Sequence, residues 1–178
     1  MVKKLLLCAV LVVFMASMAF AEEVSPWAAK VDGGITGVYK SVTDGTFKGM
    51  AQFSILRSMW GNKIFGKFAF KNINDAVSEG VGFNGENYAV GTYIYAHDPV
   101  IAEKTKTPIA YITAGVGGAH QPGYFAKVSF DAGIGFFFPH PFGERLGNWC
   151  VELSAFNAQT EEGDYWSGTL SLGLQIGL

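Results

Sequence analysis

The last stretch of the chain, residues 166–178, most constrains the fold because its side chains alternate strictly in character. Even-numbered positions hold large apolar residues or Gly, odd-numbered positions hold small or polar residues, and none is charged. A period of two is typical of a β-strand with two different faces. The stretch is at least as long as the ~9–11 residues with which a tilted strand crosses a bilayer. It therefore predicts a strand whose apolar face meets lipid.

The amino-terminal segment, residues 1–21, has the three parts of a secretory signal peptide. Two lysines come first, an apolar run follows over residues 5–20, and small residues precede the expected cleavage after Ala21. The run is shorter than the ~20 residues of a membrane-spanning helix. We therefore expect residues 1–21 to be removed and residues 22–178 to form one domain.

The composition of the expected mature chain excludes several classes of protein. Cleavage leaves 11 basic against 15 acidic residues, a balance that argues against a nucleic-acid partner. Only Cys150 remains, so no internal disulfide is possible. Charged residues make up 16% of the whole chain, below the ~25% of soluble domains, while aromatic residues reach 15%. With no later apolar segment long enough for a spanning helix, these values favour a transmembrane barrel.

Seven segments upstream repeat the alternation of the tail, and turn residues bound each of them. Together with the tail they give eight strands, an even number that closes an antiparallel barrel without free edges. The predicted fold is all-β, an eight-stranded antiparallel up-and-down transmembrane barrel. The seven segments are residues 30–40, 47–56, 63–71, 88–97, 109–119, 124–138 and 149–157.

Charges are confined to one face of these predicted strands. A Lys or Arg on the lipid side of a barrel costs roughly 2–4 kcal/mol at the bilayer midplane, so the charged face should point inward. The predicted inward charges are Lys30, Asp32, Lys40, Lys48, Lys63, Lys67, Lys71, Lys127, Asp131 and Glu152.

An eight-stranded barrel is just wide enough for side chains to fill its interior. We therefore expect the charges nearest mid-barrel to pair across the lumen as structural charges rather than to line a conduit. They are Lys48, Lys67, Lys127, Asp131 and Glu152. The lysines at the predicted strand ends are expected to reach water, and these are Lys30, Lys40, Lys63 and Lys71.

The tail also resembles the carboxy-terminal assembly signal of bacterial outer-membrane barrels, at Ser171, Gly173, Ile176 and Leu178. The family usually ends in Phe, whereas this chain ends in Leu178. By the pattern of its strands the chain is similar to small OmpA/OmpX-like barrels, and we expect no peptidoglycan-binding domain. The resemblance implies location in the bacterial outer membrane and contact with its lipid and lipopolysaccharide. It also implies insertion by the barrel-assembly machinery, with both termini on the periplasmic side.

That orientation places aromatic residues at two levels, as expected for membrane interfaces. Trp27, Trp60, Phe138 and Trp149 fall at the periplasmic level, and Tyr39, Phe47, Phe70, Tyr88, Tyr124 and Trp166 fall at the outer level. The outward loops, residues 41–46, 72–87, 120–123 and 158–165, contain acids but no Lys or Arg between the strand ends. They either remain solvated or bind a cationic or divalent-ion-bridged partner.

Three functions are compatible with this fold. The first is an outer-membrane barrel with a structural or surface-interaction role. The second is a soluble periplasmic lipocalin-like carrier, which would turn its apolar face inward around an apolar ligand. The third is an outer-membrane enzyme that modifies lipid A, but no Ser lies within two residues of His97, His120 or His140. The uninterrupted apolar face of the tail favours the first, with no catalytic residue, metal or cofactor expected.

Overall fold

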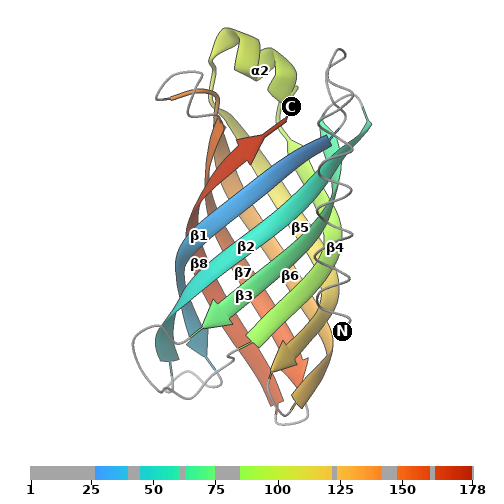
Figure 1. The fold of residues 1–178 in the computed structure, drawn as a ribbon, viewed down its shortest axis with the longest axis vertical. Helices are drawn as coiled ribbons and strands as arrows, with labels where there is room; N and C mark the ends of the chain where they lie inside the picture. Colours follow the sequence, from blue (N-terminus) through green and yellow to red (C-terminus); the bar gives the residue numbers. More distant parts are fainter. Residues whose placement is uncertain are drawn as a thin grey trace, which may run out of the picture.

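The described part of the chain folds into eight β-strands and one short helix (Figure 1). The computed structural model describes residues 27–39, 45–60, 63–74, 85–121, 124–141, 148–160 and 163–177. The strands are β1 (Trp27–Tyr39), β2 (Gly45–Trp60), β3 (Ile64–Asn74), β4 (Gly85–Tyr95), β5 (Ile109–Gln121), β6 (Tyr124–Phe138), β7 (Asn148–Thr160) and β8 (Gly163–Ile176), and the helix is α2 (Pro99–Thr105). The expected signal peptide lies outside the described residues.

The strands close into a barrel in chain order. Each strand pairs antiparallel with its neighbours in sequence, and β1 pairs with β8 to complete the ring. At this seam Ile35 lies opposite Leu170 and Ala29 lies opposite Ile176. Closure satisfies the backbone groups of both edge strands, which a bilayer requires. The predicted fold class is confirmed.

The two faces of the wall have opposite polarity. Large apolar side chains point outward, with 66% of Ile35 and 60% of Leu170 exposed. Their sequence neighbours Thr36 and Thr169 point inward and are fully buried. A water-soluble barrel has the reverse arrangement, so the outer wall of this barrel is suited to hydrocarbon.

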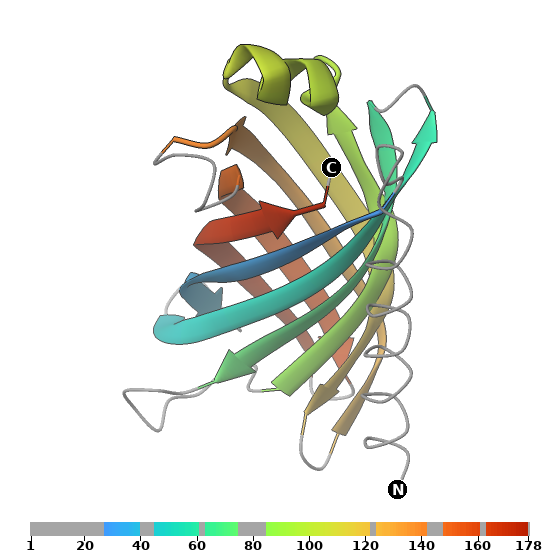
Figure 2. The ribbon, with the colours of Figure 1, turned by 45° about the horizontal axis from the view of Figure 1, so that its top comes forward.

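The connection between β4 and β5 holds α2, at the barrel end where β1 begins and β8 ends (Figures 1 and 2). Asp98 caps the helix by accepting a hydrogen bond from the backbone N–H of Val100 at 2.9 Å, and Pro99 occupies the first turn. Lys106 ends it in the left-handed conformation, with φ of 55°. No helix in the described part of the chain is long and apolar enough to span a membrane.

Several strand ends differ from their predicted positions. β4 ends at Tyr95, so His97, which the predicted strand 88–97 includes, lies exposed in the bend before α2. The last residues of β7 and the first of β8 fill most of the predicted loop 158–165, and β3 continues to Asn74. Backbone pairing continues beyond the last alternating apolar side chain, so the hydrophobic pattern understates strand length. Most of the predicted loops 41–46 and 72–87 lie outside the described residues.

Candidate functional site in the barrel lumen

The centre of the lumen holds a charge cluster built around Lys30 of β1, which is fully buried. Its Nζ lies 2.7 Å from Glu152 Oε2 on β7 and 3.0 Å from Asp32 Oδ1. Two tyrosines complete the cluster, because the hydroxyls of Tyr93 and Tyr111 each accept a hydrogen bond from Lys30 at 3.2 Å. Both hydroxyls in turn donate to Glu152 Oε2, Tyr111 at 3.0 Å. One ammonium is thus shared between two buried carboxylates.

A second ion pair joins β3 to β6 through Lys67 and Asp131. Lys67 Nζ also donates to Thr113 Oγ1 on β5 at 2.9 Å, so three strands meet at this lysine. Gly115 makes room for the pair, because a Cβ at this position would collide with the carboxylate of Asp131. The Gly-rich run of β5 therefore has a packing role in the lumen.

The remaining predicted lumen charges have different surroundings. Lys48 points inward and is 2% exposed. Lys127 belongs to β6, close to the register shift at Gly117 and Ala119 of the neighbouring strand β5. Its side chain is not among those that the structure describes. The expectation that Lys30 and Lys71 reach water is wrong, since they are 0% and 3% exposed. Their strands extend beyond the predicted ends, which places both lysines inside the barrel.

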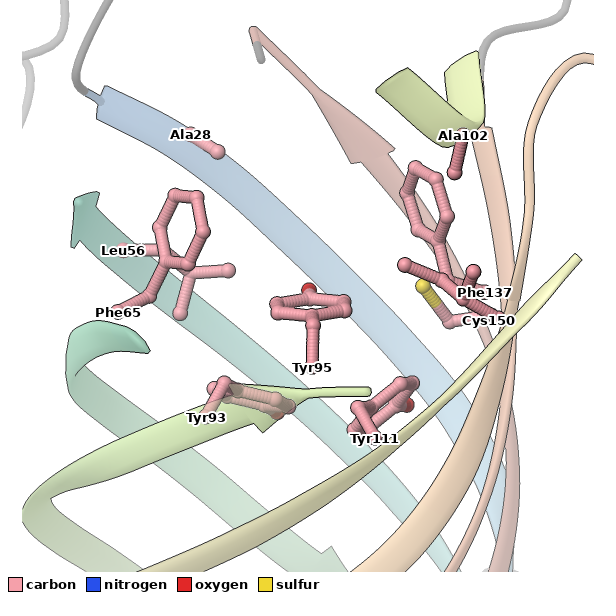
Figure 3. Close-up of a cluster of buried hydrophobic side chains, with 10 residues drawn as sticks. Ala28, Leu56, Phe65, Tyr93, Tyr95, Ala102, Tyr111, Phe137 and Cys150 are labelled. Atoms are coloured by element: carbon pink, nitrogen blue, oxygen red, sulfur yellow. The ribbon is translucent and has the colours of Figure 1, made fainter. Parts of the chain in front are cut away.

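An apolar and aromatic cluster lies in the lumen at the end that carries α2 (Figure 3). The ring of Tyr95 lies between Phe65 and Phe137, with centroid distances of 5.5 and 6.0 Å, and its hydroxyl donates to Gln175 Oε1 at 3.1 Å. We call this set the α2-end cluster. Its members are Ala28, Leu56, Phe65, Tyr93, Tyr95, Ala102, Ile109, Tyr111, Phe137 and Cys150.

A second buried cluster lies at the opposite end of the barrel. It includes Ile73 and Phe156, which are 0% and 1% exposed, and Lys71 Nζ lies 5.5 Å from the centroid of the Phe156 ring. The charged groups of the lumen therefore lie between two buried apolar clusters. We call this set the far-end cluster, formed by Val38, Met50, Ile73, Ala119, Phe156, Ala158 and Tyr165.

The three histidines considered for catalysis do not meet in one place. His120 lies near the end of β5 at the far end of the barrel, whereas His97 and His140 lie at the α2 end. His140 Nε2 is 2.9 Å from Glu103 Oε1, which ties the connection after β6 to α2. Within the described residues, no group of three or more His, Cys, Asp or Glu residues could hold a metal ion.

The predicted assembly signal lies on the closing strand. Ser171 and Gly173 face the lumen, and Ile176 faces outward opposite Ala29. A Cβ at Gly173 would collide with the carboxylate of Asp32, so this Gly also accommodates the central charge cluster. Leu178 lies outside the described residues, and recognition of this motif during assembly stays a prediction.

The sequence analysis did not assign tyrosines to the charge cluster, although the period of two places Tyr93 and Tyr95 on the same face of β4. It also missed Arg57, because the predicted strand ended at residue 56 while β2 continues to Trp60. The alternation extended by one step places Arg57 on the outer face, where the structure shows it exposed. The period of two thus indicates both the common face of the two tyrosines and the outward position of Arg57.

A closed eight-stranded barrel with an apolar exterior and a charged interior defines the class of transmembrane β-barrels. Among solved structures, the barrel is similar to Neisserial surface protein A, with a TM-score of 0.62, 11% identity, and coverage of 88% of this chain and 100% of that chain. The amino-terminal barrel domain of Pseudomonas aeruginosa OprF has a TM-score of 0.48 and 12% identity, with coverage of 84% of this chain and 97% of that domain. Ail of Yersinia pestis has a TM-score of 0.47 and 15% identity, with coverage of 84% of this chain and 97% of that chain. Comparisons of the sequence with protein-family models and with curated proteins find no match. The expected resemblance to small outer-membrane barrels is confirmed in the fold.

Proposed function

We propose that the protein is an integral barrel of the bacterial outer membrane whose lumen is filled and whose role is structural or surface-interacting. The observation that carries this proposal is the reversed polarity of the wall. Outward positions such as Ile35, Ile134 and Leu170 are 60% or more exposed, while Lys30 and Asp32 are buried inside. The free energy of transferring this surface from water to hydrocarbon favours a bilayer.

The soluble carrier is less well supported by the same geometry. A carrier of an apolar ligand needs an apolar interior and a polar exterior. Here the centre of the lumen holds the ion pairs of Lys30 with Glu152 and Lys67 with Asp131. Desolvated charges at this position would oppose the entry of an apolar molecule.

The scattered histidines favour a role other than lipid A modification. Acyl transfer by a serine requires the hydroxyl, an imidazole and a carboxylate within hydrogen-bond reach of one another. His140 meets the carboxylate of Glu103, but its Nδ1 is buried without a hydrogen-bond partner. The geometry thus supports a pair that fixes α2 to the neighbouring connection.

A surface role would use the end of the barrel opposite α2. The described acidic residues at this end are Glu86 and Asp164. The sequences of the predicted outward loops contain further acidic residues. In the proposed orientation this end faces the exterior, where a cationic or divalent-ion-bridged partner would complement it. Insertion would use the barrel-assembly machinery through the motif on β8.

The filled lumen predicts that the barrel passes no steady ion current. Ions would have to cross the α2-end cluster around Tyr95 and Phe137 and then the far-end cluster around Phe156, all of which are buried. The measurement is conductance in planar bilayers, on protein whose insertion is checked by its altered mobility on an unheated gel. Reproducible open-channel current would show that the inner charges line a pore, and the filled-lumen proposal would be abandoned.

A further inference from the structure

A groove with a volume of about 610 Å³ lies on the wall formed by β2, β3 and β4 near the α2 end. This volume is within the ~300–1,000 Å³ of typical ligand pockets. Its outward side chains include one cation, Arg57, and several apolar residues. The groove is lined by Trp27, Ile55, Arg57, Ser58, Met59, Gly66, Lys67, Phe68, Val90 and Gly91.

Arg57 supplies the charge of this groove. Among the strand side chains that the structure describes, it is the one Lys or Arg on the outer surface. Its guanidinium carbon lies 5.1 Å from the centroid of the Trp27 ring, a cation–π contact that holds it at the groove. No carboxylate of the described residues pairs with it. A guanidinium at the edge of a lipid-facing surface is best satisfied by an anion.

The wall beside Arg57 is apolar and continues toward mid-barrel. Ile55, Phe68 and Val90 lie opposite one another across β2, β3 and β4. Along β2, Ile55 is two residues further than Arg57 from the end of the strand, so this row lies nearer mid-barrel. Gly66, which pairs with Arg57, carries no side chain, and Met59 lies over it, with its Sδ 2.9 Å from where a Cβ would be. The groove thus presents a cationic end followed by a hydrophobic surface.

We propose that this groove binds a diacyl phospholipid, with the phosphate on Arg57 and an acyl chain along Phe68 and Val90. Guanidinium and phosphate form bidentate, charge-assisted hydrogen bonds. Trp27 marks the interfacial level at which headgroups lie. The described residues that line the groove include no acid, so an anionic headgroup such as phosphatidylglycerol is favoured over a zwitterionic one. This site rests on the proposed membrane location and adds a specific lipid contact to it.

The first test is retention of phosphatidylglycerol, measured by native mass spectrometry on the full barrel after reconstitution into vesicles of phosphatidylcholine with phosphatidylglycerol. Arg57→Gln should weaken retention by about tenfold or more, the effect of losing a hydrogen bond to a charged group. Lys63→Gln is the matched control, because Lys63 is an exposed cation at the same barrel end outside the groove. This control should retain lipid as the wild type does.

The second test fills the groove. Val90 and Val116 pair across β4 and β5 and are 56% and 46% exposed, but only Val90 lines the groove. Val90→Trp should displace the lipid, whereas Val116→Trp should not. Both changes add apolar bulk on the lipid side, where folding tolerates it.

Four results would overturn the site. Retention by Arg57→Gln equal to the wild type would show that no headgroup binds there, and equal losses in Arg57→Gln and Lys63→Gln would show a general charge effect. A dimer that Arg57→Gln abolishes would assign the groove to a second copy of the chain. Failure of the wild type to enter vesicles would reject the membrane location and the site together, whereas insertion with unchanged retention rejects the site alone.

Discussion

Replacement of Lys30 by Met is expected to lower the free energy of unfolding by about 3–5 kcal/mol, the usual effect of breaking a buried ion pair. The change removes the ammonium that Asp32 and Glu152 share, and these two carboxylates are 2% and 5% exposed. Two carboxylates would then face each other in a desolvated lumen. The tyrosine hydroxyls that donate to Glu152 compensate only part of this charge.

Urea-induced unfolding of the barrel in lipid vesicles measures this loss. Lys63→Met is the control, since Lys63 is an exposed lysine in the turn before β3 and its replacement should change stability by about 0.5 kcal/mol or less. Combining Lys30→Met with Asp32→Asn and Glu152→Gln removes the stranded charges and should recover much of the loss. Equal stabilities of Lys30→Met and Lys63→Met would mean that the central cluster does not stabilise the fold.

Replacement of Leu170 by Lys is expected to cost about 2–4 kcal/mol, because the side chain points outward near the middle of β8. Leu170 lies opposite Ile35 on β1 and Leu153 on β7, and all three are more than half exposed. The new ammonium would lie in hydrocarbon, and neither of these two neighbours could pair with its charge.

The matched control is Leu170→Phe, which alters size at the same position without adding charge. It should fold into vesicles as the wild type does, while Leu170→Lys should leave a smaller folded fraction on unheated gels. If Lys were tolerated as well as Phe, this row would face water and the assignment of the outer wall would be wrong.

The period of two was sufficient to predict the number of strands, the all-antiparallel order and the facing of most residues. Successive side chains of a strand point to opposite faces of the sheet, which gives the period of two. Because one face meets lipid and the other meets the lumen, apolar and polar residues alternate in the sequence. Leu170 and Thr169 illustrate this, since their predicted facings agree with their exposures of 60% and 0%. Strand ends were less accessible to prediction because the ladder of backbone hydrogen bonds continues through residues without an alternating pattern.

The pairing of the lumen charges could not be predicted in the same way. Lys30 and Glu152 are 122 residues apart in sequence and meet because of the register and tilt of the closed sheet. The alternation places both residues on the inner face but contains no information about the level at which each lies. The helix α2 was not predicted for another reason. Asp98 and Pro99 are local signals for the start of a helix, but the segment that follows them lacks the periodicity that would identify a helix in sequence.

The most direct test of the membrane-spanning assignment uses nitroxide labels at Ile35, Leu153 and Leu170, one at a time, in a Cys150→Ser background and in vesicles. These positions lie on one row of the outer wall. We expect frequent collisions of each label with oxygen dissolved in the bilayer and few with a water-soluble nickel chelate. Frequent collisions with the chelate and few with oxygen at all three positions would contradict it.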